Sequence, residues 1–494
     1  MNNMKKRLSA LAILASILLI GCAADKGDAK TDETVDANTD SAVATEALTP
    51  EESVLKHLPE ASYFNGETFN IGWSQQYDFN EVYFTLEEAE GDSIYEAVYE
   101  RNRMTEEKLG ITIVGENIGS WLDIPKTVAK LVQSDDDTYD VFCMSTVQTF
   151  NCVLQGYLCD ISALDVINFE NPWWDSQAIL EQYSHGTDNV YFISGDINYQ
   201  DDYALSAVMF NKRLCAEQDI QPYDDVRNNT WTVDTYFKYL SLFGADLDGN
   251  GKYTKHDMYG ATNGSGILSY FLAASGEHLV CFDKEGNAYL NSNERIFDVA
   301  NKVLNLVNDK NNPSYCIVDA NPAIDWVIGG TLFPNEHAAF TEDSIHKINE
   351  MRFTMEEDFG VLPFPKFDED QKEYHAPLST ASATVFSIPV SNDKAEMSAW
   401  IMEMMGMYST DTVRYAAMEK VLMGKSIRDS ESEDMLNIIF DTKFYDLGFW
   451  GSEIYNEVCP MVRSYKNNFV SLIESMQNKT EKQYETVKEY YSFD

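Results

Sequence analysis

Short apolar runs alternate with amphipathic stretches after residue 68, and this alternation is the feature that most limits the possible folds. The apolar runs are 69–73, 111–114 and 139–144, and the stretches 93–109 and 124–132 carry apolar residues at helical spacing. Strand, helix, strand, helix, strand in this order predicts a parallel, doubly wound α/β unit. In such units ligands bind beyond the carboxyl ends of the strands.

The length of the chain adds a second constraint. With 494 residues it exceeds the size at which one hydrophobic core stops growing, about 250–300 residues. Residues 204–327 have a mainly helical pattern, strand-like runs return at 338–340, 359–363 and 383–388, and 435–491 is helical again. Two domains are therefore expected.

The charge of the chain excludes some classes of partner. The sequence has 36 basic and 81 acidic residues, a formal net charge of −45 at pH 7. A surface this acidic repels the phosphates of nucleic acids and the headgroups of anionic lipids, so no nucleic-acid partner is expected. Neutral and cationic small molecules remain open as ligands.

The first residues have the pattern of an export signal. Lys5, Lys6 and Arg7 precede an apolar stretch, residues 8–20, that is too short to span a bilayer comfortably. The stretch ends in Leu-Ile-Gly-Cys, which resembles the lipobox of bacterial lipoproteins. This resemblance implies a signal peptide over 1–22 and a lipid on Cys22. The alternative is a buried cysteine after a short anchor helix.

The segment after Cys22 supports export and anchoring. Residues 23–65 are rich in Asp, Glu, Thr and Ala and show no apolar periodicity over most of their length, which is typical of a disordered tether. The chain is therefore expected to be exported and lipid-anchored to the outer face of the bacterial cytoplasmic membrane.

Seven further cysteines are scattered and odd in number, which argues against a disulfide framework, and none has zinc-site spacing.

Several short sequence segments resemble those of a known family. They are Phe210-Asn211-Lys212 after an apolar run, Trp231-Thr232 before a helical stretch, the proline-rich segment 359–366, and Ile388-Pro389-Val390-Ser391 before a helix. In this order, and together with the lipobox, they resemble the extracellular solute-binding proteins of ABC sugar importers, bacterial family 1. The resemblance covers about residues 68–491.

The resemblance implies an α/β, two-lobe periplasmic-binding-protein-like fold of type II, with hinge crossings between the lobes. The expected division is 66–200 for the first part of lobe 1, 201–330 for the first part of lobe 2, 331–382 for a return to lobe 1, and 383–494 for a return to lobe 2 with the C-terminal helices. Such a protein closes on its ligand as a monomer and docks on an ABC transporter permease.

A carbohydrate site needs aromatic rings and hydrogen-bonding side chains. Residues of these types just past strand ends or near the crossings are the expected ligand contacts. A Trp after a strand is more often core, and one carboxylate among 81 is more often solvated. Trp173 and Trp174 are read as packing, and Trp326 is a competing aromatic. The expected contacts are Trp73, Gln75, Ser145, Gln148, Asp201, Tyr203, Glu342, Asp343 and, from the aromatic stretch 444–450, Trp450.

Residues 246–257 fit a calcium loop at most positions. Oxygen ligands would come from the side chains of Asp246, Asp248 and Asn250 and from the carbonyl of Lys252, with glycine at position 6. Position 12 holds Asp257 where Glu is usual, and this shorter side chain reaches less well. The expectation is a structural Ca²⁺; the alternative is a plain turn with solvated charges.

The sequence contains no zinc-protease, nucleophile-elbow, Walker or dinucleotide motif. The function expected is therefore binding without catalysis: capture of a carbohydrate, an oligosaccharide, for an ABC transporter. The alternatives are a peptide- or polyamine-binding protein of the same fold, a surface glycoside hydrolase that uses two carboxylates, and an adhesion or scaffold lipoprotein.

Overall fold

The computed structural model describes residues 48–75, 91–184, 189–307, 314–324, 326–446 and 453–490, with the side chains of 75, 183–184 and 486–490 left out. The predicted signal peptide, the lipid on Cys22 and the start of the predicted tether lie outside these ranges. Among the described residues no helix combines the length and the apolar character that crossing a bilayer requires.

The sheet of the first lobe contains β1 (Thr68–Gln75), β2 (Thr112–Ser120), β3 (Val141–Ser145) and β12 (Thr384–Ser387). Its order is β12-β3-β1-β2. β1 is parallel to both β2 and β3, whereas β12 is antiparallel to β3. The parallel strands confirm the predicted α/β unit. The helices of this part are α4 (Ser93–Leu109), α5 (Ile124–Gln133), α6 (Thr146–Val153), η1 (Ile161–Leu164) and α7 (Ser176–Ser184).

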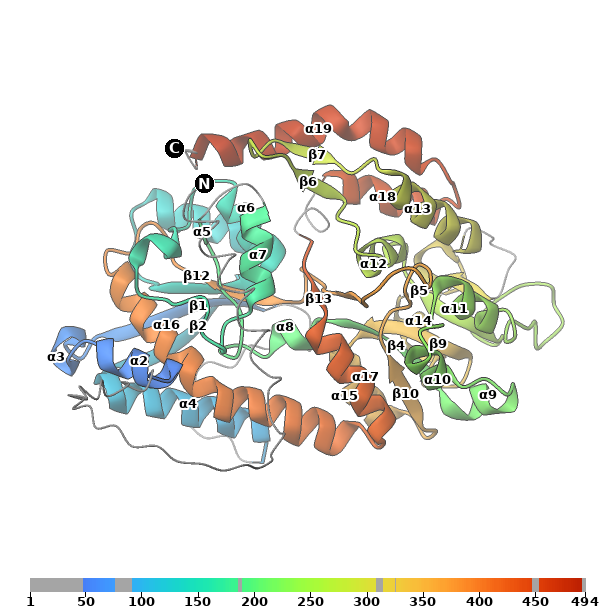
Figure 1. The fold of residues 1–494 in the computed structure, drawn as a ribbon, viewed down its shortest axis with the longest axis horizontal. Coiled ribbons are helices and arrows are strands. Elements are labelled where there is room, and N and C mark those ends of the chain that lie inside the picture. Colours follow the sequence, from blue (N-terminus) through green and yellow to red (C-terminus); the bar gives the residue numbers. More distant parts are fainter. Residues whose placement is uncertain are drawn as a thin grey trace, which may run out of the picture. The chain divides into compact units, whose positions relative to one another are not determined.

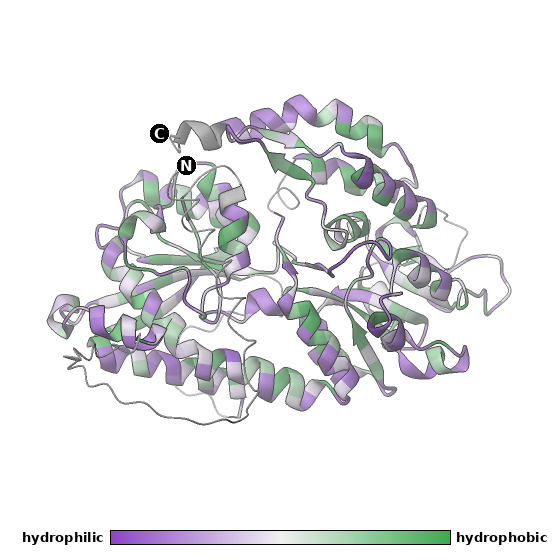
Figure 2. Cartoon of the chain, viewed as in Figure 1, coloured by the Kyte–Doolittle hydropathy of each residue, from purple (hydrophilic) through white to green (hydrophobic). Residues whose placement is uncertain are grey.

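Local signals explain why α4 has the bounds that the periodicity predicts. The carboxylate of Asp92 accepts hydrogen bonds from the backbone N–H groups of Ile94 and Tyr95 and so caps the first turn. Gly110 ends the helix with φ of 71°, a left-handed conformation that glycine adopts without steric cost. The apolar face, which includes Ile94, Val98 and Leu109, is buried. In Figure 2, α4 accordingly alternates between hydrophilic and hydrophobic residues along its length.

Two helices replace the last part of the predicted tether. They are α2 (Pro50–His57) and α3 (Ala61–Phe64). Thr49 and Glu52 form a reciprocal capping box at the start of α2. Val54 and Phe64 are buried in the core of the first lobe. The expected end of the tether at residue 65 is therefore wrong, because a capped helix and two core side chains order the chain from residue 50 onward.

The sheet of the second lobe contains β4 (Ser206–Asn211), β5 (Tyr259–Asn263), β8 (Tyr315–Ile317), β9 (Ala338–Ser344) and β10 (Phe359–Leu362). Its order is β10-β4-β9-β5-β8. β5 is parallel to β8 and β9, and β4 is antiparallel to both of its neighbours. Its helices are α9 (Lys212–Glu217), α10 (Pro222–Arg227), α11 (Val233–Leu240), α12 (Ile267–Ala274), α13 (Glu294–Val307), η2 (Val318–Ala320), α14 (Trp326–Leu332) and α15 (His346–Thr354).

The pairing of β9, β10 and β12 corrects the expected division of the chain after residue 330. β9 lies between β4 and β5, and β10 pairs with β4, so 331–382 stays in the second lobe instead of returning to the first. β12 pairs with β3, so the stretch that begins at 383 enters the first lobe. The strand-like runs themselves were correctly predicted. The lobe to which each strand belongs was predicted wrongly, because a short apolar run carries no information about which sheet edge it joins.

The chain passes between the lobes at α8 (Gln200–Tyr203), at residues 378–383, and through a long helical stretch. This stretch continues α16 (Ala395–Ser409) through the π-helical turns Thr410–Arg414 and Ala416–Ser426 (Figure 1). It contacts α4 of the first lobe and α15 of the second. The first passage lies at the expected boundary between residues 200 and 201. The second lies at the expected boundary between 382 and 383, but there the chain passes from the second lobe to the first.

The C-terminal part returns to the second lobe, and it is helical, which agrees with the pattern of 435–491. It contains α17 (Ser430–Asp441), the short β13 (Lys443–Phe444), α18 (Glu453–Arg463) and α19 (Phe469–Tyr490). β13 pairs with β11 (Ala376–Pro377), and α19 contacts β7 (Ala288–Leu290), the partner of β6 (Val280–Phe282). On α19 the ring of Tyr484 lies 6.0 Å from that of Phe150 on α6, so this helix also reaches the first lobe. The seven cysteines of the described part form no disulfide.

Candidate functional site

The predicted contacts at the carboxyl edge of the first sheet have mainly local partners. Ser145 is fully buried and caps α6, since its hydroxyl accepts the backbone N–H of Gln148 at 3.4 Å. The side-chain oxygen of Gln148 accepts a hydrogen bond from Asn151 at 3.1 Å. Trp73 is partly buried and packs against the core of the first lobe. The side chain of Gln75 and the whole of Trp450 lie outside the described residues.

Asp201 and Tyr203 lie on α8, in the interior of the crossing. The Oδ2 of Asp201 is 3.2 Å from the Nζ of Lys443, which also lies 3.0 Å from Asp175. Burial raises the pKa of Asp201 well above its ordinary value, and Lys443 opposes that shift. Tyr203 is buried and donates its hydroxyl to the carbonyl of Ala417 at 2.9 Å. In this state neither side chain is open to a ligand.

Glu342 and Asp343 end β9, and Glu342 points into the second lobe. Its carboxylate accepts the hydroxyl of Tyr236 at 2.5 Å and that of Tyr315 at 3.2 Å. Burial raises the pKa of Glu342 to about 7 in spite of these hydrogen bonds. Burial likewise raises the pKa of Asp343 to about 6, and its carboxylate accepts the backbone N–H of Ser344. Glu342 is therefore an interior carboxylate, whereas Asp343 is only partly buried.

A pocket lies where α12 meets the segments that pass between the lobes. Tyr270 and Phe444 give it aromatic walls and Asp446 gives it a carboxylate. Ser269 lines the pocket, and its buried hydroxyl has no hydrogen-bond partner among the described residues. A buried hydroxyl without a partner is costly, so a hydrogen bond to this group would be favourable. The lining residues are Ser269, Tyr270, Ala273, Pro377, Leu378, Phe444 and Asp446.

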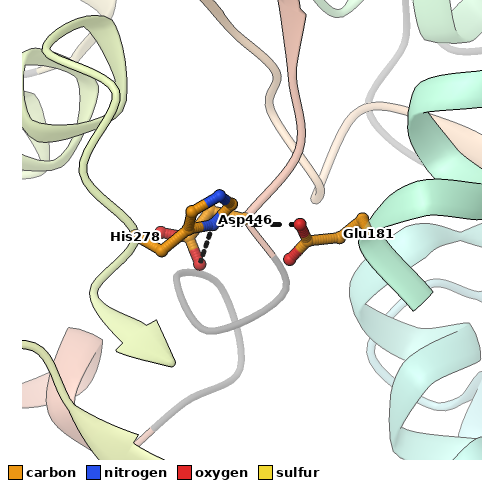
Figure 3. A group of neighbouring side chains, drawn as sticks. All are labelled: Glu181, His278 and Asp446. Atoms are coloured by element: carbon orange, nitrogen blue, oxygen red, sulfur yellow. Dashed lines mark ion pairs between the residues drawn. The ribbon is translucent and has the colours of Figure 1, made fainter. Parts of the chain in front are cut away.

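A cluster of titratable groups adjoins the pocket (Figure 3). The Nδ1 of His278 lies 3.8 Å from Glu181 Oε2 and 3.9 Å from Asp446 Oδ1. Both carboxylates are buried, and the imidazole ring lies 4.4 Å from the ring of Phe444. Burial disfavours the charged imidazole, but the interaction with Asp446 and the charge of Glu181 outweigh it and raise the pKa of His278 to about 9.

The cluster joins the two lobes. Glu181 belongs to α7, where the neighbouring Gln182 donates to the carbonyl of Phe192 at 2.8 Å. The next residue, Ile193, bridges to Phe386 of β12 in the first-lobe sheet. His278 follows α12 of the second lobe, and Asp446 follows β13. Figure 3 shows Glu181 reaching from its helix toward the imidazole.

Trp326 is the most open of the tryptophans described in the structure. It begins α14 and is 63% exposed, whereas Trp173 and Trp174 are 1% and 4% exposed. The two buried rings confirm the packing role expected of them. The indole of Trp326 lies over Gly264, just past the end of β5, where a Cβ atom would come within 2.0 Å of the ring. An exposed ring at the carboxyl edge of parallel strands is well placed for a ligand.

The loop 246–257 brings together the carboxylates of Asp246, Asp248 and Asp257, whose oxygens lie within 4.8 Å of one another. Asp246 accepts the backbone N–H groups of Gly249 and Gly251 at 2.8 and 2.7 Å. Asp257 is buried and accepts N–H groups of Leu247 and Thr254. Asn250 and Lys252 are exposed in the same loop. The carboxylates thus share one side of a turned loop, an arrangement compatible with a hard cation.

Sequence reasoning missed most residues of the pocket and of the cluster. Ser269 and Tyr270 sit in an apolar helix, and Glu181 is one acidic residue among many, so none stands out. Phe444 begins the aromatic stretch that was noted, which is the one signal that pointed here. Their proximity depends on three segments distant in sequence, α7, α12 and β13.

Comparisons with known proteins establish the fold. No protein-family model and no curated protein matches the sequence. Among solved structures, the maltose/maltodextrin-binding domain MalE from Bdellovibrio bacteriovorus bound to maltotriose is 15% identical, with a TM-score of 0.50 over 85% of this chain and 99% of that one. The ABC substrate-binding protein Lmo0181 from Listeria monocytogenes in complex with cycloalternan is 13% identical, with a TM-score of 0.51 over 87% and 100%. The chain therefore has the α/β two-lobe periplasmic-binding-protein fold of these substrate-binding proteins.

Proposed function

We propose that this protein is a lipid-anchored extracellular solute-binding protein that captures a carbohydrate between its lobes and delivers it to the permease of an ABC transporter. The observation that carries the proposal is the pocket between α12 and the crossing segments, on a fold shared with proteins solved in complex with maltotriose and cycloalternan. The ligand proposed is an oligosaccharide, and the protein acts as a monomer.

The chemistry of the pocket suits a sugar. The rings of Tyr270 and Phe444 offer apolar faces to the C–H side of a pyranose. Asp446 offers carboxylate oxygens to hydroxyl donors, and the hydroxyl of Ser269 has free hydrogen-bonding capacity. Trp326 supplies a further exposed ring on the second lobe. We assign these residues to the carbohydrate site; the nine contacts expected from sequence remain predictions.

The fold supplies a mechanism for capture. One of the passages between the lobes, residues 378–383, begins at the pocket, directly after β11, which pairs with β13. A ligand that contacts α12 and these segments together favours the closed arrangement by its differential affinity for that state. The closed form is the one proposed to dock on the permease. Capture and delivery of this kind need no chemical change in the ligand.

The loop 246–257 is proposed to hold a structural Ca²⁺. The arrangement of Asp246, Asp248 and Asp257 supports this, since hard cations prefer several oxygen ligands. The loop lies between α11 and β5, so the ion would fix a turn of the second lobe without touching the pocket residues.

Thermal unfolding of the purified chain with a panel of oligosaccharides tests the proposed function. A ligand that binds the folded state raises the melting temperature with its concentration. The expected result is a rise with one class of oligosaccharide that is recovered unchanged by chromatography. Release of shorter sugars would support a glycoside hydrolase instead. A flat response to sugars with a rise for peptides or polyamines would replace the carbohydrate by those ligands.

A further inference from the structure

The cluster Glu181–His278–Asp446 has the composition and spacing of a metal site. It combines one imidazole with two carboxylates, whose ligand atoms all lie within 4.8 Å of one another. We propose that it binds a divalent transition-metal ion of the zinc class, and that the bound ion bridges the two lobes. This inference does not depend on the proposed carbohydrate or on the calcium loop.

The distances are close to those of a zinc site. Zinc bonds to nitrogen and oxygen are about 2.0–2.2 Å, so two ligand atoms of a tetrahedral site lie roughly 3.3–3.5 Å apart. The Nδ1 of His278 is 3.8 Å from Glu181 and 3.9 Å from Asp446. The two pairs that include His278 have to approach by only about half an ångström, which side-chain torsions allow. An imidazole ligand selects zinc-class metals over Ca²⁺ and Mg²⁺, which prefer oxygen.

Neighbouring groups hold the ligands in position. The Oδ2 of Asp446 accepts the backbone N–H of Leu279 at 3.0 Å, which leaves Oδ1 directed to His278. The backbone carbonyl of His278 accepts the amide of Asn291 at 3.0 Å, and its ring packs on Phe444. Metal sites are commonly oriented by such supporting contacts. The partnerless hydroxyl of Ser269 lies in the adjoining pocket, of which Asp446 is a wall, so a polar occupant is expected on this side.

The burial of the two carboxylates favours a bound cation. Glu181 is 8% and Asp446 is 4% exposed, so both lie in an environment of low polarity. Buried charges are costly unless they are paired or coordinate a metal.

The ligands come from parts of the chain that move relative to one another in a closing protein. Glu181 is on α7 of the first lobe, His278 follows α12 of the second, and Asp446 lies on the return segment. The full set of ligands therefore exists only when the lobes are together. An ion bound there stabilises the closed form by its higher affinity for that form.

Calorimetric titration of the purified chain with Zn²⁺, in excess Ca²⁺ to saturate the oxygen-only loop, tests the proposal. The wild type is expected to bind one Zn²⁺ per chain at this site. His278→Gln and Glu181→Gln are each expected to weaken binding at least tenfold, because even supporting contacts of metal ligands are worth about 10–100-fold. The matched control is His375→Gln, whose ring lies 5.4 Å from Phe444 outside the cluster and which should keep wild-type affinity.

The outcomes are decisive without any sugar. Absence of Zn²⁺ binding, or wild-type affinity in His278→Gln, would overturn the site. Weakening by His278→Gln but not by Glu181→Gln would overturn the bridge between lobes. Should the variants unfold, the visible absorption of the wild type with Co²⁺ decides: an intense four-coordinate spectrum supports the site, and the weak spectrum of the hydrated ion refutes it. The oligosaccharide titration is a separate measurement, so the two proposals fail independently.

Discussion

Lys443 and Asp201 form an ion pair of 3.2 Å inside the protein, between β13 and α8. Asp175 and Asp202 contact the same ammonium group at 3.0 and 2.5 Å, and Tyr445 donates its hydroxyl to Asp175. One buried lysine thus connects the end of the first lobe, the first crossing and the return segment. It neutralises only part of the carboxylate charge that surrounds it.

Replacing Lys443 should therefore destabilise the fold severely. Lys443→Met leaves buried carboxylates without their cation, and breaking a buried pair in this way costs about 3–5 kcal/mol. Urea denaturation measures the loss. The control is Lys394→Met, which breaks the exposed pair with Glu67 and should cost less than about 1 kcal/mol. Equal losses of unfolding free energy in the two variants would show that the buried ion pairs of Lys443 stabilise the fold no more than the exposed pair does.

The indole of Trp326 should contribute to carbohydrate affinity. Trp326→Ala removes an exposed ring beyond β5 without opening a core cavity, so the melting temperature of the free protein should hardly change. Aromatic anchors are worth about 2 kcal/mol or more in binding sites, which corresponds to a loss of affinity of at least about thirtyfold. Titration calorimetry with the sugar found by the thermal screen measures it. Tyr63→Ala, an exposed ring on α3, is the control and should bind normally.

Ser269 should have opposite effects on stability and on binding. Its buried hydroxyl has no partner in the described structure, and such a group costs about 1–3 kcal/mol. Ser269→Ala is therefore expected to leave the free protein as stable or more stable, and to weaken sugar binding by about 0.5–1.5 kcal/mol through a lost hydrogen bond. Urea denaturation measures the expected change in the free energy of unfolding, and titration calorimetry measures the expected loss of sugar affinity. Unchanged affinity would remove Ser269 from the carbohydrate site.

Glu342 should make stability fall as the pH rises. Its folded-state pKa of about 7 lies above the ordinary value of 4.5, because burial disfavours the charge. The folded state therefore holds this proton more tightly, and the stabilisation present below about pH 4.5 is lost by about pH 7. Glu342→Gln cannot ionise, so its loss of stability between pH 5 and pH 8 should be smaller than that of the wild type by about 2–4 kcal/mol. Glu396→Gln, on the exposed side of α16, should follow the wild type.

Calcium should stabilise the second lobe through the loop 246–257. Added Ca²⁺ is expected to raise the melting temperature, and a chelator should reverse the rise, because the ion binds only the folded loop. The double substitution Asp246→Ala, Asp248→Ala removes two of the clustered carboxylates and should abolish the response. Indifference of the wild type to chelator would leave the loop as a turn with solvated charges.

Local patterns in the sequence determined most elements of the fold. The capping residue Asp92, the apolar periodicity and Gly110 specify α4, and apolar runs located β1, β3, β9 and β10. These signals act over a few residues and need no distant partner. The packing role predicted for Trp173 and Trp174 was also correct, since both rings are buried.

The lobe of each later strand and the make-up of the pocket could not be read in this way. β9 inserts between β4 and β5 because its edges are complementary to theirs, and an apolar run alone does not encode its neighbours. Asp201 and Glu342 were predicted to contact the ligand because of their positions near predicted crossings and strand ends. In the structure Asp201 forms an ion pair with Lys443. Glu342 accepts hydrogen bonds from the hydroxyl groups of Tyr236 and Tyr315. The sequence thus determined which helices and strands form, through short-range capping and periodicity. Which side chains meet at the pocket and at His278 was decided by the folding of α7, α12 and β13 onto one another, because contacts between residues so far apart in the sequence leave no local signal.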